Sequence, residues 1–256
     1  MNRTTVIAAA VAVERRKTLA SRVILTTTVL LVAGIAFLAG SLTMAAESGN
    51  ERVVAQLGPM AGTSGWNLLL GVVAQVTAAA ALLGFGVALS WMFGREFADG
   101  TISGLFALPV SRPAIAAAKL LVYLAWAFAV ATVLVLLLGC IGLLLGLGPL
   151  DTGVLATLAR QHILTVLSAV LAIPAAWVAT LGRGLLPGIA TTIGLIVTAQ
   201  VMVVAGTGAW FPLAAPALWA LSPASATLPQ LCLVALVPLL FIPATVLTWR
   251  RLQLDR

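Results

Sequence analysis

The sequence predicts an all-α integral membrane protein with six transmembrane helices. Of its 256 residues, 62% are hydrophobic and 8% are charged, whereas soluble domains are about half apolar and one quarter charged. The apolar residues form continuous runs of about 20 or more, which is the length that a helix needs to cross the hydrocarbon core. Strands of a membrane barrel would instead alternate in polarity over about ten residues.

Six stretches bounded by charged residues, Gly or Pro fit this length. They are residues 23–44, 66–93, 120–147, 163–181, 185–205 and 231–249. Residues 1–256 are therefore expected to form a single transmembrane domain.

The distribution of basic residues predicts the orientation, because Lys and Arg are retained on the cytoplasmic side. Twelve of the 14 basic side chains fall on one side of the expected spans, against Arg52 and Arg160 on the other. The twelve are Arg3, Arg15, Arg16, Lys17, Arg22, Arg95, Arg112, Lys119, Arg183, Arg250, Arg251 and Arg256. Both chain ends are therefore expected in the cytoplasm, which agrees with an even number of spans.

The basic cytoplasmic segment 1–22 precedes the first apolar run. Its Arg15, Arg16 and Lys17 are expected to attract anionic headgroups of membrane lipid, at about 1 kcal/mol each. The Arg15-Arg16 pair also resembles a twin-arginine export signal. We expect no cleavage, because the first apolar run is long for such a signal and five more spans follow.

The connection formed by residues 94–119 gathers five charged side chains between the second and third apolar runs. It is too long for a simple turn and too polar for the bilayer. Ile102, Leu105 and Phe106 recur at helical spacing, which predicts a short helix along the membrane surface. Glu96 is expected near the start of this helix with Asp99, where carboxylates favour the helix dipole.

Two prolines limit this short helix. Pro109 is expected to end it, and Pro113 to begin the third transmembrane helix. Two interpretations are open: a solvated loop whose charges fix the topology, or a docking element for a cytoplasmic partner. Exposed Leu105, Phe106 and Leu108 would favour docking, because apolar side chains on a surface are the usual anchors of an interface.

One pattern in this connection resembles the segment after the second span of ABC-2 type transporter permeases. The pattern consists of Glu96, Gly100-Thr101, Leu105, Leu108-Pro109-Val110-Ser111-Arg112 and, at a helix start, Lys119. The resemblance implies that residues 94–119 are a cytoplasmic coupling segment whose helix sits in a cleft of an ATP-binding subunit. The residues to which it assigns this coupling role are Glu96, Gly100, Thr101, Leu105, Phe106, Pro109, Ser111 and Arg112. The basic N-terminal segment, the six spans and the long last outer connection agree with it.

The resemblance also implies an assembly: two copies of this chain with two copies of an ABC ATP-binding subunit, in the inner (plasma) membrane. The motif G-x-x-x-x-G-K-[ST], which cradles nucleotide phosphates, does not occur in the sequence. ATP and Mg²⁺ are therefore expected on a separate ATPase chain, and neither a cofactor nor a metal is expected on this one. Cys140 and Cys232 agree, because each lies in an apolar run without a His or acidic neighbour.

The sequence argues against an enzyme and against nucleic-acid binding. The spans hold no nucleophile-base pair and no paired carboxylates. The net charge of +7 comes from basic residues at the ends of apolar runs, and these form no continuous basic stripe. An ion-coupled carrier is also disfavoured, since such carriers use buried ionisable groups or broken helices at the midplane. His162 is expected at the outer end of the fourth span, as an interfacial residue.

The last outer connection, residues 207–229, carries no charge but contains several aromatic residues and four prolines. We expect a re-entrant loop of short helices that are broken at Pro212 and Pro216 and packed against protein. The resemblance implies that this region caps a translocation path. Trp210, Phe211 and Trp219 are then candidates for an outer gate, and interfacial anchoring is the alternative.

Gln75 in the second span and Gln200 in the fifth stand out among the polar side chains in the apolar runs. Hydrogen bonds between helices would explain both. If the second and fifth helices line a path, as the resemblance implies, Gln75 and Gln200 are the first candidates for lining it. An uncharged path would suit an apolar or amphipathic substrate, such as a drug, an antimicrobial peptide or a lipid-like molecule.

Together these observations predict the permease subunit of an ATP-driven ABC exporter, with multidrug export among the options. The alternative is a membrane scaffold or immunity protein that binds a partner without transport. An ATPase reading frame beside this one would favour the permease.

Overall fold

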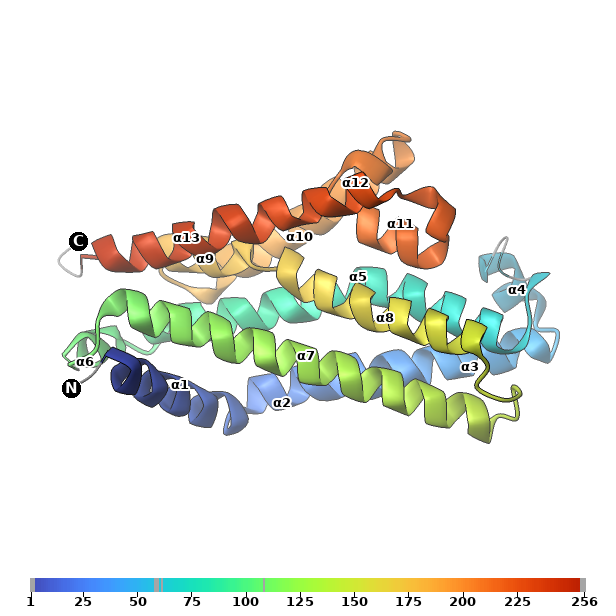
Figure 1. Cartoon of the computed structure of the whole chain (residues 1–256), viewed down its shortest axis with the longest axis horizontal. Coiled ribbons are helices and arrows are strands. Elements are labelled where there is room, and N and C mark those ends of the chain that lie inside the picture. Colours follow the sequence, from blue (N-terminus) through green and yellow to red (C-terminus); the bar gives the residue numbers. More distant parts are fainter. Residues whose placement is uncertain (1–2, 58–59, 61, 108, 254–256) are drawn as a thin grey trace.

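The computed structural model describes residues 3–57, 60, 62–107 and 109–253. It confirms the all-helical fold, with six helices that are long and apolar enough to cross a membrane. These helices have 20 to 34 residues each and run along the long axis of an elongated bundle (Figure 1).

The spans are built from the following helices. The first comprises α2 (Arg22–Val29), the π-helical η1 (Leu30–Gly34) and α3 (Ile35–Glu47), and the second is α5 (Gly65–Ala98). The third is α7 (Arg112–Leu144), the fourth comprises α8 (Thr152–Leu171) and α9 (Pro174–Leu181), and the fifth is α10 (Leu185–Val204). The sixth comprises α12 (Leu228–Cys232), η5 (Leu233–Ala235) and α13 (Leu236–Arg251). Outside the spans lie α1 (Arg3–Leu19), α4 (Glu51–Leu57), α6 (Ile102–Phe106), η3 (Gly208–Trp210), α11 (Ala215–Leu221) and η4 (Pro223–Ser225).

Both ends of the described chain lie at the same end of the bundle as α6, and α4 lies at the opposite end (Figure 1). We call these the α6 end and the α4 end. The helix α1 packs against α7 near its start. Large apolar side chains such as Phe37 and Leu186 are exposed along the spans, as expected for a bundle surrounded by lipid.

Two spans begin before the apolar runs that predicted them. The third begins at Arg112, with Pro113 in its first turn as the sequence predicted, although its apolar run begins at residue 120. The fourth begins at Thr152 rather than at residue 163, and the Asp151 side chain accepts the Val154 N–H at its start. Each helix continues through a charged residue that bounds the apolar run in the sequence, Lys119 in α7 and Arg160 in α8.

Arg160 and His162 consequently lie inside α8 and not beyond its end. The expectation that His162 marks the outer end of the fourth span is wrong. Its ring packs edge-on against Phe128 of α7, with ring centroids 5.0 Å apart. Pro174 interrupts this span, because α8 ends at Leu171 and α9 begins at the proline.

Two aromatic side chains connect the spans through their polar atoms. The Tyr123 hydroxyl donates to the Ala169 carbonyl at 2.8 Å and joins α7 to α8. The Trp126 indole N–H donates to the Thr28 hydroxyl at 2.9 Å and joins α7 to α2. Such bonds between helices satisfy the polar atoms that the bilayer cannot hydrate.

The helices α5 and α10 meet along a seam of small residues in the half of the bundle nearer α6. The seam consists of Gly86, Ser90 and Gly94 on α5, Gly188 and Thr192 on α10, and Gly184 at the N-cap of α10. A Cβ atom built on Gly86 would lie 2.2 Å from the Thr192 hydroxyl oxygen, and one on Gly188 would lie 2.4 Å from the Ser90 hydroxyl oxygen. Residues spaced by four on both helices therefore allow the close backbone approach that membrane helices use for association.

The last outer connection contains short helices, as expected. Its elements η3 and α11 are separated by a turn that includes Pro212. The expected break at Pro216 is wrong, because this proline lies in the first turn of α11, where its missing N–H needs no partner. The short helix α11 packs against α5 and α8.

Candidate coupling site

Four charged side chains from three helices form a buried charge cluster at the α6 end. Glu14 and Lys17 lie on α1, Glu96 in the last turn of α5, and Lys119 on α7. The Lys119 Nζ atom lies 2.9 Å from Glu14 Oε2 and 2.9 Å from Glu96 Oε1. The Lys17 Nζ atom lies 3.2 Å from Glu14 Oε1 and 3.0 Å from Glu96 Oε1. Each lysine bridges the same two carboxylates, so the cluster is neutral.

Lys119 is the most deeply buried member of the cluster, with 1% of its surface exposed. Its ammonium group also reaches the Met92 carbonyl at 3.1 Å. A lysine ammonium carries three donors, and each of them has an acceptor here. Buried charges of this kind are tolerated only when every partner is in place. The cluster therefore fixes α1, α5 and α7 relative to one another.

Lys17 lies at the edge of the cluster, on the extramembrane helix α1. Burial alone would lower the pKa of Lys17, but the Glu14 and Glu96 carboxylates outweigh it and raise this pKa above its ordinary value of 10.5. The stabilisation from Lys17 is therefore complete below about pH 10.5 and is lost as the pH rises through the raised pKa. At neutral pH the Lys17 ion pairs do not respond to small changes in acidity.

Thr101 attaches α6 to the charge cluster. Its hydroxyl donates to Glu96 Oε2 at 2.7 Å, the carboxylate oxygen that the two lysines leave free, and Thr101 directly precedes α6. The expectation that Glu96 and Asp99 begin a surface helix is wrong, because Glu96 lies inside α5 and Asp99 is the C-cap of α5. A carboxylate is unfavourable at that end of a helix dipole. The cluster lysines compensate for it.

A second attachment joins α6 to α13. The Phe106 ring packs edge-on against Trp249, with ring centroids 6.0 Å apart. The Arg112 guanidinium lies over the Phe106 ring, 4.2 Å from its centroid, and donates to the Leu252 carbonyl. The helix α6 is thus attached at two points: to the charge cluster through Thr101, and to α13 through Phe106.

In residues 94–119, the expected coupling segment, the exposed surface consists of small and polar residues. The exposed ones are Ala98, Asp99, Gly100, Thr101, Ser103, Gly104, Ala107, Pro109 and Ser111. The expectation of exposed apolar anchors is wrong for Leu105, which is 8% exposed, and Phe106 is half-buried. Leu108 lies outside the described residues. The described apolar side chains of α6 hold the segment against the bundle and leave its backbone and hydroxyl groups accessible.

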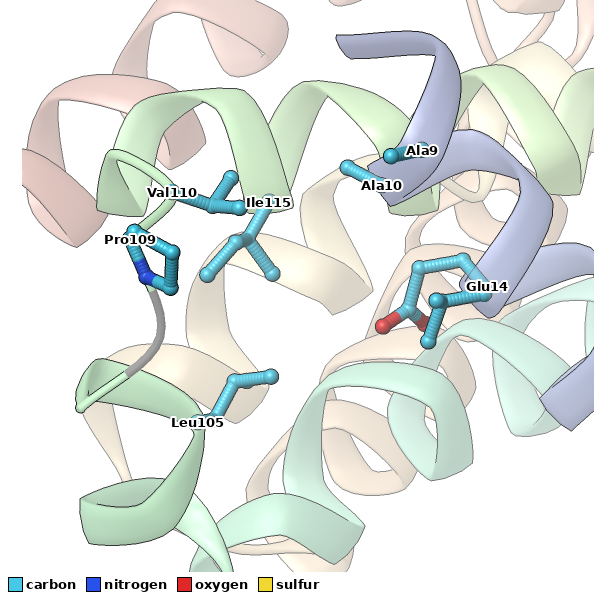
Figure 2. Close-up of a pocket in the computed structure, with 8 residues that line it drawn as sticks. Ala9, Ala10, Glu14, Leu105, Pro109, Val110 and Ile115 are labelled. Atoms are coloured by element: carbon cyan, nitrogen blue, oxygen red, sulfur yellow. The ribbon is translucent and has the colours of Figure 1, made fainter. Parts of the chain in front are cut away.

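An apolar groove of about 200 Å³ lies between α1 and the coupling segment (Figure 2). It is lined by Ala9, Ala10, Val13, Glu14, Leu105, Pro109, Val110 and Ile115. Figure 2 shows Leu105 and Ile115 pointing into the space that faces Ala10. Glu14 borders this groove and is also a member of the charge cluster, so the groove and the cluster are adjacent.

Gln75 and Gln200 line one cavity of about 290 Å³ between α5 and α10. The structure thus brings together the two glutamines that the sequence singled out. The residues that close the cavity from the last outer connection are Leu213, Ala214, Ala217, Leu218 and Leu221. On α5, Gln75 at the cavity and Gly86 at the seam are separated by about 16 Å along the helix. The same two helices are therefore in close contact at the seam and apart at the cavity.

The three expected gate residues are not among the described residues that line this cavity. Trp210 is 65% exposed and Phe211 is half-buried. Trp219 packs beside the contact of Ala74 on α5 with Ala220 on α11. Trp219 therefore anchors α11 to the spans, and Trp210 faces outward.

Sequence reasoning missed the charge cluster as a unit. Lys119 was the available signal, because it is a single charge followed by a long apolar run. Its partner Glu14 could not be identified without the tertiary structure. A second missed contact joins α8 to α5, where the buried Gln161 side chain donates to the Thr77 hydroxyl at 2.7 Å.

The match to known proteins covers both the charge cluster and the coupling segment. Residues 10–200 match the ABC-2 family transporter protein, which is more than half of the chain. The chain belongs to the ABC-2 transporter family. Together with the six apolar helices, this makes it a multi-pass membrane permease of the ABC-2 type.

One curated relative of this ABC-2 permease is a bacitracin transport permease protein of Bacillus licheniformis. The two are 41% identical over 66 residues. The aligned stretch covers 25% of this chain and 32% of the relative, so the chain spans about a third of the protein that it matches. No solved structure gives a significant match.

Proposed function

We propose that this permease exports an apolar or amphipathic molecule from the cell, driven by a separate ABC ATP-binding subunit. The observation that carries the proposal is the charge cluster, because it joins α6 to α1, α5 and α7 through buried ion pairs. A force applied to α6 would then reach three helices at once. Two copies of this chain and two ATPase subunits, which bind ATP and Mg²⁺, form the complete transporter in the plasma membrane.

The α6 end faces the cytoplasm in this proposal. The basic residues of the connections are concentrated on that side of the spans. ATP is available there, and α6 is small enough to enter a cleft of the ATPase. The exposed polar residues of the coupling segment meet that cleft, and the adjacent apolar groove accepts an apolar side chain of the same subunit.

The substrate class follows from the Gln75 and Gln200 cavity and from the relative. Apolar side chains predominate in the walls of the cavity, and two amides supply hydrogen bonds. Such a site suits a largely apolar molecule with a few polar groups. The relative's name refers to the transport of bacitracin, which favours antimicrobial peptides among the candidate substrates.

A steric block on α6 tests the partner. Gly104 is exposed, and a Cβ atom built there meets nothing within 4 Å. Gly104→Trp should therefore fold normally but prevent entry into a cleft. The matched control is Gly62→Trp, at a glycine near α4 where a Cβ atom also has open space.

The measurement is copurification of the permease with an ABC ATP-binding subunit from its own membranes, followed by ATPase activity. We expect wild type and Gly62→Trp to retain the ATPase at equal stoichiometry, and Gly104→Trp to lose most of it. An ATPase retained equally by all three proteins would place the docking surface elsewhere. A wild-type protein that binds no ATPase would contradict the proposed function itself.

A further inference from the structure

Arg160 is a charged residue placed well inside a membrane-spanning helix. It follows the start of α8 at Thr152 by eight residues, which is about 12 Å of helix. The fourth span has 30 residues, or about 45 Å, so about 7 Å of it projects beyond each side of a hydrocarbon core of about 30 Å. With the span centred in the bilayer, the Arg160 backbone lies about 5 Å inside the edge of the hydrocarbon core at the α4 end.

The side chain of Arg160 is directed back toward that surface. One terminal nitrogen donates to the Thr157 hydroxyl at 2.7 Å, and Thr157 lies one turn nearer the start of α8. An arginine below the membrane surface places its head at the interface in this way. The guanidinium is thus held at the level of lipid headgroups.

No described residue neutralises Arg160. The ion pairs among the described residues do not include it, and its Nε atom is buried without a hydrogen-bond partner. The acidic residues at the α4 end are used elsewhere or exposed: Asp151 caps α8, Glu47 accepts from the Gly65 N–H, and Glu51 is exposed. A charge at this depth needs a counter-charge, and it must come from outside the chain.

The position of Arg160 also connects it with the last outer connection. Leu164 lies one turn further along α8, on the same face, and is buried against Ala74 of α5 and Ala220 of α11. Arg160 therefore lies on the face of α8 that contacts α11 one turn further along the helix. That short helix also closes the Gln75 and Gln200 cavity.

We infer that Arg160 binds the phosphate of a membrane phospholipid at the α4 end of the bundle. The planar guanidinium matches a phosphate with two parallel hydrogen bonds, and its terminal nitrogens supply the donors. Thr157 positions the group, and the acyl chains lie along the apolar surface of α8. The bound lipid supplies the counter-charge that the chain lacks.

The experiment measures thermal unfolding of the purified, delipidated permease in neutral detergent with three additions: dioleoylphosphatidylglycerol, dioleoylglycerol, which has no phosphate, or inorganic phosphate. Wild type is compared with Arg160→Gln, with Arg160→Lys, and with Arg52→Gln as the control. Arg52 is the other basic residue at this end and is exposed on α4.

We expect phosphatidylglycerol, but not dioleoylglycerol, to stabilise wild type and Arg52→Gln. Arg160→Gln should weaken the apparent affinity for the phospholipid at least tenfold. The affinity of Arg160→Lys should lie between those of wild type and Arg160→Gln, because lysine keeps the charge but loses the paired hydrogen bonds.

Stabilisation by inorganic phosphate that requires Arg160, without an effect of the lipid, would overturn the lipid assignment in favour of a soluble anion. Equal stabilisation of wild type and Arg160→Gln by the phospholipid would overturn the site. Arg160→Gln removes an unpaired charge, so it should fold, and Arg160→Lys provides a second readout if it does not.

Discussion

Lys119 of α7 and Glu14 of α1 are separated by 105 residues in the chain, yet their charged atoms lie 2.9 Å apart in a buried ion pair. This contact changes the interpretation of the N-terminal segment. Its basic residues suggested attraction to lipid headgroups, but α1 is also fixed to the bundle by Glu14 and Lys17. The helix that leads into the first span is therefore attached to the coupling segment.

Lys119→Met should destabilise the permease by about 3–5 kcal/mol, because it leaves two buried carboxylates with too little positive charge. Thermal unfolding in detergent measures this loss. The compensated variant Lys119→Met with Glu96→Gln should recover part of it, since the removed charges balance. Lys17→Met should cost less, because its side chain is 31% exposed. A Lys119→Met protein as stable as wild type would show that the cluster does not hold the helices together.

The spans were predictable from sequence, and the site was predictable in part. Continuous apolar runs are a local property, so the number of spans was correct. Gln75 and Gln200 could be paired because the family resemblance placed the second and fifth helices together. The contact of Glu14 with Lys119 depends on how α1 folds back against α7, which no local pattern shows. Arg160 was misplaced because a charge was read as the end of an apolar run, although a long side chain can reach the interface from inside a helix.

Thr101→Val tests whether α6 moves with the charge cluster. The substitution keeps the shape of the side chain and removes the hydroxyl that donates to Glu96. We expect the free energy of unfolding to fall by only about 1 kcal/mol. Hydrogen exchange in α6 should nevertheless be faster, because one of the two attachments of this helix is gone. Ser103→Ala is the control, since Ser103 is exposed and its hydroxyl contacts only the nearby Gly100 carbonyl, at 3.5 Å. Equal exchange in wild type and Thr101→Val would argue against this attachment.

Two glycines of α10 give a matched test of the seam. A Cβ atom on Gly188 would meet the Ser90 hydroxyl and, at 2.9 Å, the Ala175 carbonyl, whereas one on Gly194 meets nothing within 4 Å. Gly194→Leu should be neutral or stabilising, because leucine favours a helix more than glycine does. Gly188→Leu should lower the free energy of unfolding by about 1–3 kcal/mol through overpacking. Similar unfolding midpoints for the two variants would mean that α5 and α10 are not in close contact.

Gln75→Leu and Gln200→Leu test whether the cavity that they share lies on the transport path. Both side chains are exposed, so neither change should alter stability by more than about 0.5 kcal/mol. Export should fall several-fold for substrates that use the amides as hydrogen-bond partners, and purely apolar substrates should be affected less.

Thr198→Val is the control, because Thr198 is exposed on α10 and its hydroxyl donates to the Gly194 carbonyl of its own helix at 2.7 Å. Growth of cells on a panel of toxic compounds, followed by uptake into inverted vesicles, measures the effect. If both leucine variants transported every compound as the control does, the cavity would be a packing feature and the path would lie elsewhere.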